Sequence, residues 1–282
     1  MITKSALELL SQAVAIEDKA AKDAGALGFM ARAMIQATMP HSKPSGNEFE
    51  RRNGNYTLTM LSPARVGLPY GTIPRLLLAW ISSEVVRTQE RTLILGDSLS
   101  DFMWQLGMVP TGGRWGSITR LRSQMLKLVS CSISCRYSDP ERDTAKKIDV
   151  ADSYDFSWWS RNEVHQTGIW KSTLTLSEGF YNEVIAHPVP IDMRALKALK
   201  KSPLAIDVYF WLTYRMSYLS TETMIPWPLL AEQFGGEYGR LRDFKAAMKD
   251  ALRQVLTIYT TANVEPTTAG LKMLPSKTHV LR

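Results

Sequence analysis

The sequence predicts an α+β protein built of two tandem winged-helix domains, a variant of the helix-turn-helix, preceded by a helical N-terminal arm. Three observations carry this prediction. A basic, amphipathic helix follows a glycine-rich turn within residues 112–128. The order of helix, short strand, helix, turn, helix and strands is predicted twice along the chain. The glycine-rich turn recurs 123 positions later, which indicates an internal duplication.

The stretch from Gly112 to Leu128 opens with glycines that suit a tight turn, and Ser117 stands where a helix cap is expected. On an ideal helix, apolar and polar side chains separate onto two faces. The packed face is predicted to hold Ile118, Leu121, Met125 and Leu128. The free face is predicted to hold Thr119, Arg120, Ser123 and Lys127, with Arg122 and Gln124 on the flanks. Four basic and no acidic residues occur between Gly112 and Lys127, so this helix suits a DNA-facing role.

Length and composition limit the class of protein. A chain of 282 residues with 45% hydrophobic residues is long enough for two domains with cores. The net charge of +7 favours a polyanionic partner. No apolar run approaches the roughly 18 to 20 residues that span a bilayer, and the N-terminus lacks a signal-peptide pattern. We therefore expect a cytoplasmic protein without a membrane partner.

The two cysteines, Cys131 and Cys135, fall on the same face of one predicted strand. Neighbours along one strand are poorly placed for a disulfide, and a structural zinc site needs two further ligands. We expect a reduced, buried pair.

The N-terminal arm is predicted over residues 1–40. Residues 5–37 are rich in Ala, Leu, Met and Lys, which indicates one long or two short helices. Such an arm either pairs with another copy or packs on the body, and packing is favoured. The polar stretch 41–55, with Pro44 and Gly46, is predicted to be a linker.

The first domain is predicted over residues 56–176. Its elements before the basic helix are a strand at 55–61, a helix opened by Pro74 and extending to Glu90, a short strand at 92–95, and a helix capped by Asp97 or Ser98. After the basic helix, alternation predicts a strand through Tyr137. A turn-prone segment at 138–147 and β-type runs at 155–160 and 169–176 follow. Trp158 and Trp159 lie on opposite faces of such a strand, so at least one belongs to the core.

The second domain is predicted over residues 177–282 and repeats this order. Asp192 caps one helix, Pro203 opens the next, and a strand at 221–225 precedes a helix at 227–234. The helix after the second glycine turn is predicted to pack through Leu241, Phe244, Met248, Leu252 and Val255. Its opposite side holds Arg242, Lys249 and Arg253. The second wing is predicted at 257–260 and 271–274.

Catalysis is not expected. The chain lacks a Gly-x-x-x-x-Gly-Lys-Ser/Thr phosphate-binding loop. Its four histidines, at positions 41, 165, 187 and 279, are far apart, and the acidic residues form no recognisable metal pair. We expect neither a cofactor nor a metal.

Several motifs resemble the plasmid-encoded RepA family of replication initiators over roughly residues 60–258. They are Gly67-Leu68-Pro69-Tyr70-Gly71 leading into 74–80, Leu95-Gly96-Asp97-Ser98-Leu99, the segment 110–116, and Arg120-Leu121-Arg122. The resemblance implies a protein that binds direct repeats (iterons) in double-stranded DNA at a plasmid origin, helps to open A·T-rich DNA, and recruits the host replication initiator and helicase machinery. It also implies tandem winged helices and, in many members, a switch between monomer and homodimer.

The predicted DNA-binding residues lie in and around the two basic helices. Base readout is predicted for Arg120, Ser123, Arg242 and Arg253, and phosphate contact for Arg114, Arg122, Lys127, Lys245 and Lys249. Ser117, Thr119 and Arg240 complete the set. The second segment also carries Glu237, Asp243 and Asp250, so the first is expected to supply more phosphate affinity and the second more selectivity. Two alternatives remain open: a transcriptional regulator that binds an operator, and a winged-helix module that binds protein.

Overall fold

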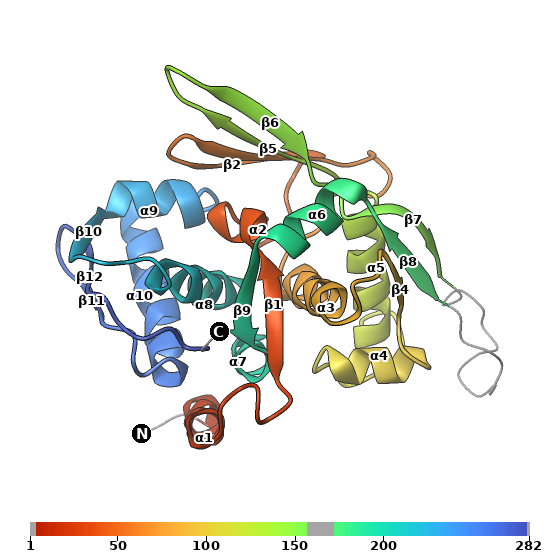
Figure 1. The fold of residues 1–282 in the computed structure, drawn as a ribbon, viewed down its shortest axis with the longest axis horizontal. Coiled ribbons are helices and arrows are strands. Elements are labelled where there is room, and N and C mark those ends of the chain that lie inside the picture. The colour runs from red at the N-terminus through yellow and green to blue at the C-terminus, as the bar shows by residue number, and fades with distance from the viewer. Residues whose placement is uncertain (1–3, 157–171, 281–282) are drawn as a thin grey trace.

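The computed structural model describes residues 4–156 and 172–280, which form a mixed structure of helices and antiparallel sheets (Figure 1). Its centre is the antiparallel pair of β1 (Leu27–Ala31) and β9 (Pro188–Asp192), in which Leu27 faces Asp192. This pairing ties the N-terminal segment to the middle of the chain. One apolar core cluster extends from this centre into both halves of the molecule.

The first unit comprises residues 72–129 and 151–176. Its elements are α3 (Thr72–Thr88), β4 (Thr92–Ile94), α4 (Leu99–Gln105), α5 (Ser117–Val129), β7 (Ala151–Asp155) and β8 (Thr173–Leu176). The three strands form a sheet of order β4-β8-β7. Ser98 caps α4, as the sequence predicts, and its hydroxyl accepts a hydrogen bond from the Asp101 N–H.

The second unit comprises residues 203–273. Its elements are α8 (Pro203–Met216), β10 (Thr223–Pro226), α9 (Trp227–Phe234), α10 (Leu241–Ile258), β11 (Val264–Pro266) and β12 (Gly270–Met273). The sheet has the order β10-β12-β11, so element succession and strand order match those of the first unit. Leu121 and Met125 of α5 are fully buried, as are their counterparts Phe244 and Met248 in α10. The structure therefore contains the same unit twice.

A four-stranded sheet lies beside the two units, along the top of Figure 1. It pairs the hairpin of β2 (Glu48–Asn53) and β3 (Tyr56–Leu61) with that of β5 (Ser132–Ser138) and β6 (Asp143–Lys147). Strand β5 confirms the predicted alternation, whereas β6 lies where a turn was predicted. Cys131 and Cys135 are buried and free, as expected, and burial raises the pKa of the Cys135 thiol to about 11.

The N-terminal arm differs from its prediction. Helix α1 (Lys4–Asp18) packs against α10 and α7 (Met193–Leu199), which confirms packing on the body. Residues 27–31, however, form β1 instead of helix, and only α2 (Arg32–Gln36) follows. The run Leu-Gly-Phe-Met-Ala pairs with β9 and lies against α3, so tertiary pairing overrides its helix-like composition.

Two further predictions were wrong. The expected linker at 41–55 contains β2, because its polar side chains alternate along a strand that pairs with β3. The expected wing strand at 257–260 begins inside α10, whose buried spacing continues through Val255 and Ile258. Helix α6 (Glu178–Ala186) was not anticipated.

Trp158, Trp159 and His165 lie outside the described residues. Across 4–156 and 172–280, the structure contains no helix long and apolar enough to cross a membrane.

Candidate nucleic-acid interface

Helix α5 has the two faces that its sequence predicts. Thr119, Arg120 and Ser123 are exposed, whereas Leu121, Met125 and Leu128 are fully buried. Arg122 and Lys127 lie half-buried at the edges of the exposed face. Gln124 is buried, and its side-chain oxygen accepts a hydrogen bond from the Tyr70 N–H at 2.9 Å. The outward face therefore combines hydroxyl groups with basic side chains.

The turn before α5 is held by its own hydrogen bonds. The Gly116 N–H donates to the Gly113 carbonyl at 3.1 Å, and the Thr119 hydroxyl donates to the same carbonyl at 2.9 Å. A Cβ at Gly116 would lie 2.2 Å from the Thr111 carbonyl oxygen, so only glycine fits this close approach. The turn is therefore an ordered extension of the α5 surface.

The prediction that Ser117 caps α5 and belongs to the DNA-binding set was wrong. The N-cap of α5 is Gly116, and Ser117 is the first helical residue. The Ser117 hydroxyl donates to the Val109 carbonyl at 2.6 Å and accepts from the Thr111 N–H at 2.8 Å. Because the side chain is buried and both roles of its hydroxyl are used internally, Ser117 stabilises the turn and does not face solvent.

A basic groove of about 370 Å³ runs along the exposed face of α5. Its lining residues are Arg65, Val66, Thr119, Arg122, Ser123, Leu126 and Lys127. The Lys127 ammonium lies 4.9 Å from the centre of the Tyr70 ring, and burial together with the nearby Lys43 lowers the pKa of Lys127. Within the described part of the chain, Arg65, Arg120 and Lys127 have no carboxylate within 4.0 Å. The groove therefore has the charge and shape to accept an anion such as a phosphate.

Helix α10 turns Arg242, Lys249 and Arg253 outward, as its sequence predicts. Phe244, Met248, Leu252 and Val255 form its buried face. Leu241 was expected to pack with them but is 40% exposed, because it is the first helical residue and precedes the turn that contacts the core.

The basic side chains of α10 already have partners. Arg242 pairs with Asp243 at 3.2 Å, and Arg253 pairs with Asp250 at 2.8 Å. The ammonium groups of Lys245 and Lys249 lie 5.6 Å and 5.9 Å from the centre of the Trp227 ring. Arg240 is exposed at the N-cap. Arg253 lies at the far end of the helix, in a groove shared with α1. The α10 surface is therefore less positive than that of α5.

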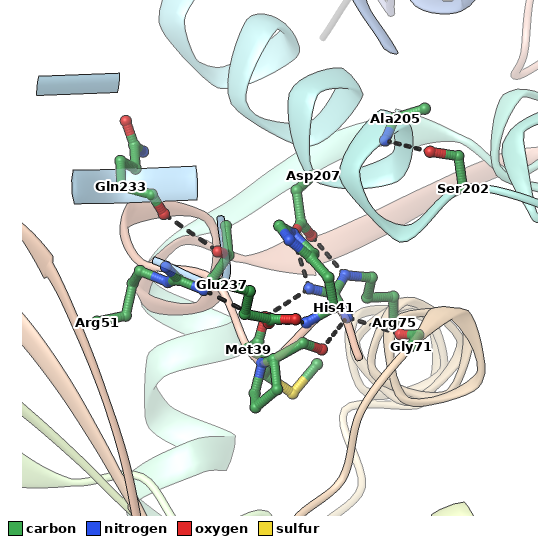
Figure 2. Close-up of polar contacts among 12 residues, drawn as sticks. Met39, His41, Arg51, Gly71, Arg75, Ser202, Ala205, Asp207, Gln233 and Glu237 are labelled. Carbon is green, nitrogen blue, oxygen red and sulfur yellow. Dashed lines mark hydrogen bonds and ion pairs between the residues drawn. The ribbon is translucent and has the colours of Figure 1, made fainter. Parts of the chain in front are cut away.

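A buried ion pair joins the first helices of the two units (Figure 2). The Arg75 guanidinium of α3 donates two hydrogen bonds of 2.7 Å to the Asp207 carboxylate of α8. Its remaining donors reach the carbonyls of Met39, Pro40 and Gly71. Arg75 and Asp207 are 1% and 5% exposed. Bidentate geometry with further hydrogen bonds is what a buried ion pair requires.

The second glycine turn is attached to this junction. The Glu237 carboxylate accepts hydrogen bonds from the backbone N–H groups of His41 and Ser42 and lies 3.8 Å from the Arg51 guanidinium (Figure 2). A Cβ at Gly236 would lie 2.3 Å from Arg51, so the missing side chain makes room for this arginine.

Burial and neighbouring charges act in opposite directions on the pKa values of Asp207 and His41. Burial by itself would raise the pKa of Asp207, but Arg75 and the hydrogen bond with His41 lower the pKa overall. Burial lowers the pKa of His41 despite the 2.8 Å contact of its Nε2 with Asp207. The junction therefore favours an ionised Asp207 beside a neutral imidazole.

Sequence reasoning assigned no role to Arg65, Lys43 or Trp115, and it did not bring the junction residues together. Arg65 and Lys43 precede α3, the first helix of the first unit, and reach the α5 surface only through the fold. The junction unites side chains that are 132 positions apart in the case of Arg75 and Asp207. Neither periodicity nor motif spacing carries such information.

Comparison with solved structures shows that the fold is similar to that of RctB domains 2 and 3. Residues of this chain superpose on domains 2 and 3 of RctB with a TM-score of 0.58 and 12% identity, covering 88% of this chain and 96% of that one. A second structure of RctB domains 2–3 matches with a TM-score of 0.53 and 12% identity over 85% and 94% of the two chains. Sequence comparison with functionally curated proteins finds no significant match.

These observations define a protein of duplicated units that share the architecture of RctB domains 2 and 3. A family model described as plasmid-encoded RepA protein matches residues 68–227. The chain belongs to the plasmid-encoded RepA family of replication initiators, as its motifs indicated.

Proposed function

We propose that this protein initiates plasmid replication by binding iterons at the plasmid origin through two winged helices, one in each unit. The observation that carries the proposal is the repeated unit, in which a helix with an outward polar face follows a helix and a turn, as in helix-turn-helix proteins. The sheets β4-β8-β7 and β10-β12-β11 then supply the wings. The domains of this proposal are residues 56–176 and 177–282.

Helices α5 and α10 are the recognition helices in this proposal. Two such helices on one chain suit successive major grooves, about 34 Å apart, so a monomer reads a long direct repeat. Arg120 and Ser123 read bases in the first unit, and Arg242 does so in the second. Arg114, Arg122 and Lys127 contact phosphates, as do Lys245 and Lys249. Thr119 and Arg240 lie at the helix starts nearest the DNA, whereas Arg253 contributes at the far end of α10.

The remaining parts of the proposal follow from the family. The protein opens A·T-rich DNA, recruits the host initiator and helicase, and switches between monomer and homodimer in the cytoplasm, without enzymatic activity of its own. The exposed cationic groove along α5 and the overall charge of +7 support a polyanionic partner.

Footprinting on the DNA that flanks the gene, followed by fluorescence anisotropy on the protected duplex, tests this proposal. We expect protection of a set of direct repeats, and an affinity that falls steeply between 50 and 200 mM salt, as phosphate contacts require.

Arg120→Ala should lose affinity and base preference, with Glu90→Ala, which removes an exposed carboxylate, as control. Protection of one operator without repeats would favour a transcriptional regulator, and no salt-dependent specific complex would favour a protein-binding module.

A further inference from the structure

Trp115 is the most exposed large apolar side chain among the described residues, at 82%. It stands in the turn before α5, and the Arg114 guanidinium lies 5.2 Å from the centre of its ring. Burial is the usual fate of an indole, because exposing its surface to water forgoes the hydrophobic stabilisation of about 25 cal/mol per Å². Among the described residues the next most exposed large apolar side chain is Val14 at 67%, so Trp115 is the strongest candidate for a contact outside the folded chain.

The duplicated unit supplies an internal reference for this position. Tyr238 is the counterpart of Trp115 at the same offset of 123 residues. The Tyr238 ring is half-buried and packs edge-on against Phe244, with 5.7 Å between ring centres. The aromatic residue of the second turn therefore belongs to the core of its own unit, while the aromatic residue of the first turn contributes almost nothing to packing.

The surroundings of Trp115 indicate what it contacts. The turn is joined to α5 through the hydrogen bond from the Thr119 hydroxyl to the Gly113 carbonyl, and the indole lies beside Arg114 on this turn. Cations beside an exposed aromatic ring are the combination that binds nucleotides, since the cations hold phosphates and the ring packs on a sugar or base.

We infer that Trp115 is an apolar DNA contact, through which the turn before α5 packs its indole against a nucleotide of the strand beside that helix. This role rests on the proposed DNA-binding function and adds an aromatic contact that only the first unit makes. The contact neutralises no phosphate. It therefore strengthens binding by a factor that does not depend on salt, in contrast to the neighbouring Arg114.

The test measures anisotropy of a fluorescein-labelled duplex carrying the footprinted repeats, at several salt concentrations, with Trp115→Ala, Trp115→Phe and Arg114→Ala. We expect Trp115→Ala to weaken binding about fivefold, with an unchanged salt slope. This is the lower end of the range for aromatic stacking on single-stranded bases, because a duplex exposes its sugars and base edges but not its base faces. Trp115→Phe should retain part of the affinity. Arg114→Ala should lose affinity mainly at low salt and flatten the slope by about one unit.

Tyr238→Ala is the matched control for folding. It should lower the melting temperature by at least about 2 °C, whereas Trp115→Ala should leave it unchanged. Unchanged DNA affinity of Trp115→Ala overturns the inference while leaving the proposed function intact. A Trp115→Ala variant that loses only self-association in sedimentation experiments also overturns it, in favour of a second copy as partner. Failure of the wild-type protein to bind the duplex overturns the proposed function itself.

Discussion

The turns before α5 and α10 have the same pattern of two glycines, a charged residue, an aromatic residue and a glycine, yet they face different surroundings. In the first turn, Arg114 and Trp115 both point into solvent. In the second, Glu237 is bonded to the segment 41–42 and Tyr238 packs on Phe244. The comparison teaches that one local sequence supports either a solvent-exposed turn or a turn packed into the protein, depending on what the rest of the chain places beside it.

The difference begins with the sign of one charge. Glu237 occupies the position of Arg114, and its carboxylate meets two backbone N–H groups and the nearby Arg51. Burial acts to raise the pKa of Glu237, but the hydrogen bonds from the Ser42 hydroxyl and from the His41 and Ser42 N–H groups lower it overall. An arginine at this position would place two cations together beside a largely buried junction. The second turn is therefore packed against the segment 41–42 and β2, whereas the first stays exposed to solvent.

The largest expected effect is a loss of unfolding free energy when the Arg75–Asp207 ion pair at the junction is broken. Asp207→Ala leaves the Arg75 guanidinium buried without its carboxylate, and breaking such a pair costs about 3–5 kcal/mol of unfolding free energy. Chemical denaturation followed by circular dichroism measures this loss. Glu90→Ala, which removes an exposed carboxylate, should stay within about 0.5 kcal/mol of the wild type.

A stability for Asp207→Ala equal to that of Glu90→Ala would show that the ion pair is not what joins the units. The double variant Arg75→Met with Asp207→Leu provides a second measurement, because it removes both charges and leaves none unpaired. We expect it to recover most of the lost stability, as replaced buried ion pairs do.

The pH dependence of the unfolding free energy tests the protonation state of His41, which contacts Asp207 at the junction. The pKa of His41 lies below its usual 6.5 in the folded protein, so the unfolded chain binds a proton that the folded chain does not as the pH falls below about 6.5. Stability should therefore be full above this value and decline below it, by at most about 1.4 kcal/mol per pH unit for one histidine. His41→Gln should flatten the decline measured between pH 7 and pH 5.

His279 is the internal comparison for that experiment. Burial lowers its pKa as well, so His279→Gln should flatten the same curve by a separate increment. A His41→Gln variant with the full wild-type decline would contradict the buried, neutral state of this imidazole.

The sequence was informative at several positions where structure depends on local spacing. The faces of α5, the cap at Ser98, the opening of α8 at Pro203 and the recurrence of the glycine turn were all predicted from residues close together in the chain. Such features follow from periodicity and capping chemistry, which act over one or two helical turns.

Features that depend on distant partners were not predictable in this way. Residues 27–31 become a strand because β9 lies beside them, and His41 is buried because Asp207 lies opposite. The exposure of Trp115 is equally hidden, since its counterpart Tyr238 has the same pattern of neighbours. A motif specifies the shape of the turn, while the fold decides whether its side chains meet protein or solvent.

The smallest expected effect on DNA affinity concerns two carboxylates of α10, one of the two proposed recognition helices. Asp243 and Asp250 hold Arg242 and Arg253 in exposed pairs, and exposed pairs contribute little to stability. Asp243→Asn with Asp250→Asn should therefore leave the fold intact while removing two negative charges from a surface proposed to face DNA. We expect an affinity gain of a few fold at low salt, corresponding to less than about 1 kcal/mol, that fades as salt screens the surface.

Anisotropy on the footprinted duplex and on a scrambled duplex of equal length measures whether this gain is selective. If the carboxylates of α10 restrain phosphate affinity so that base contacts decide binding, the double variant should gain more on the scrambled duplex than on the repeats. Glu90→Gln with Glu141→Gln, which removes two exposed carboxylates outside the second unit, is the matched control for net charge. An equal gain from both double variants would mean that only total charge matters, and the proposed contrast between a phosphate-binding α5 and a selective α10 would then be wrong.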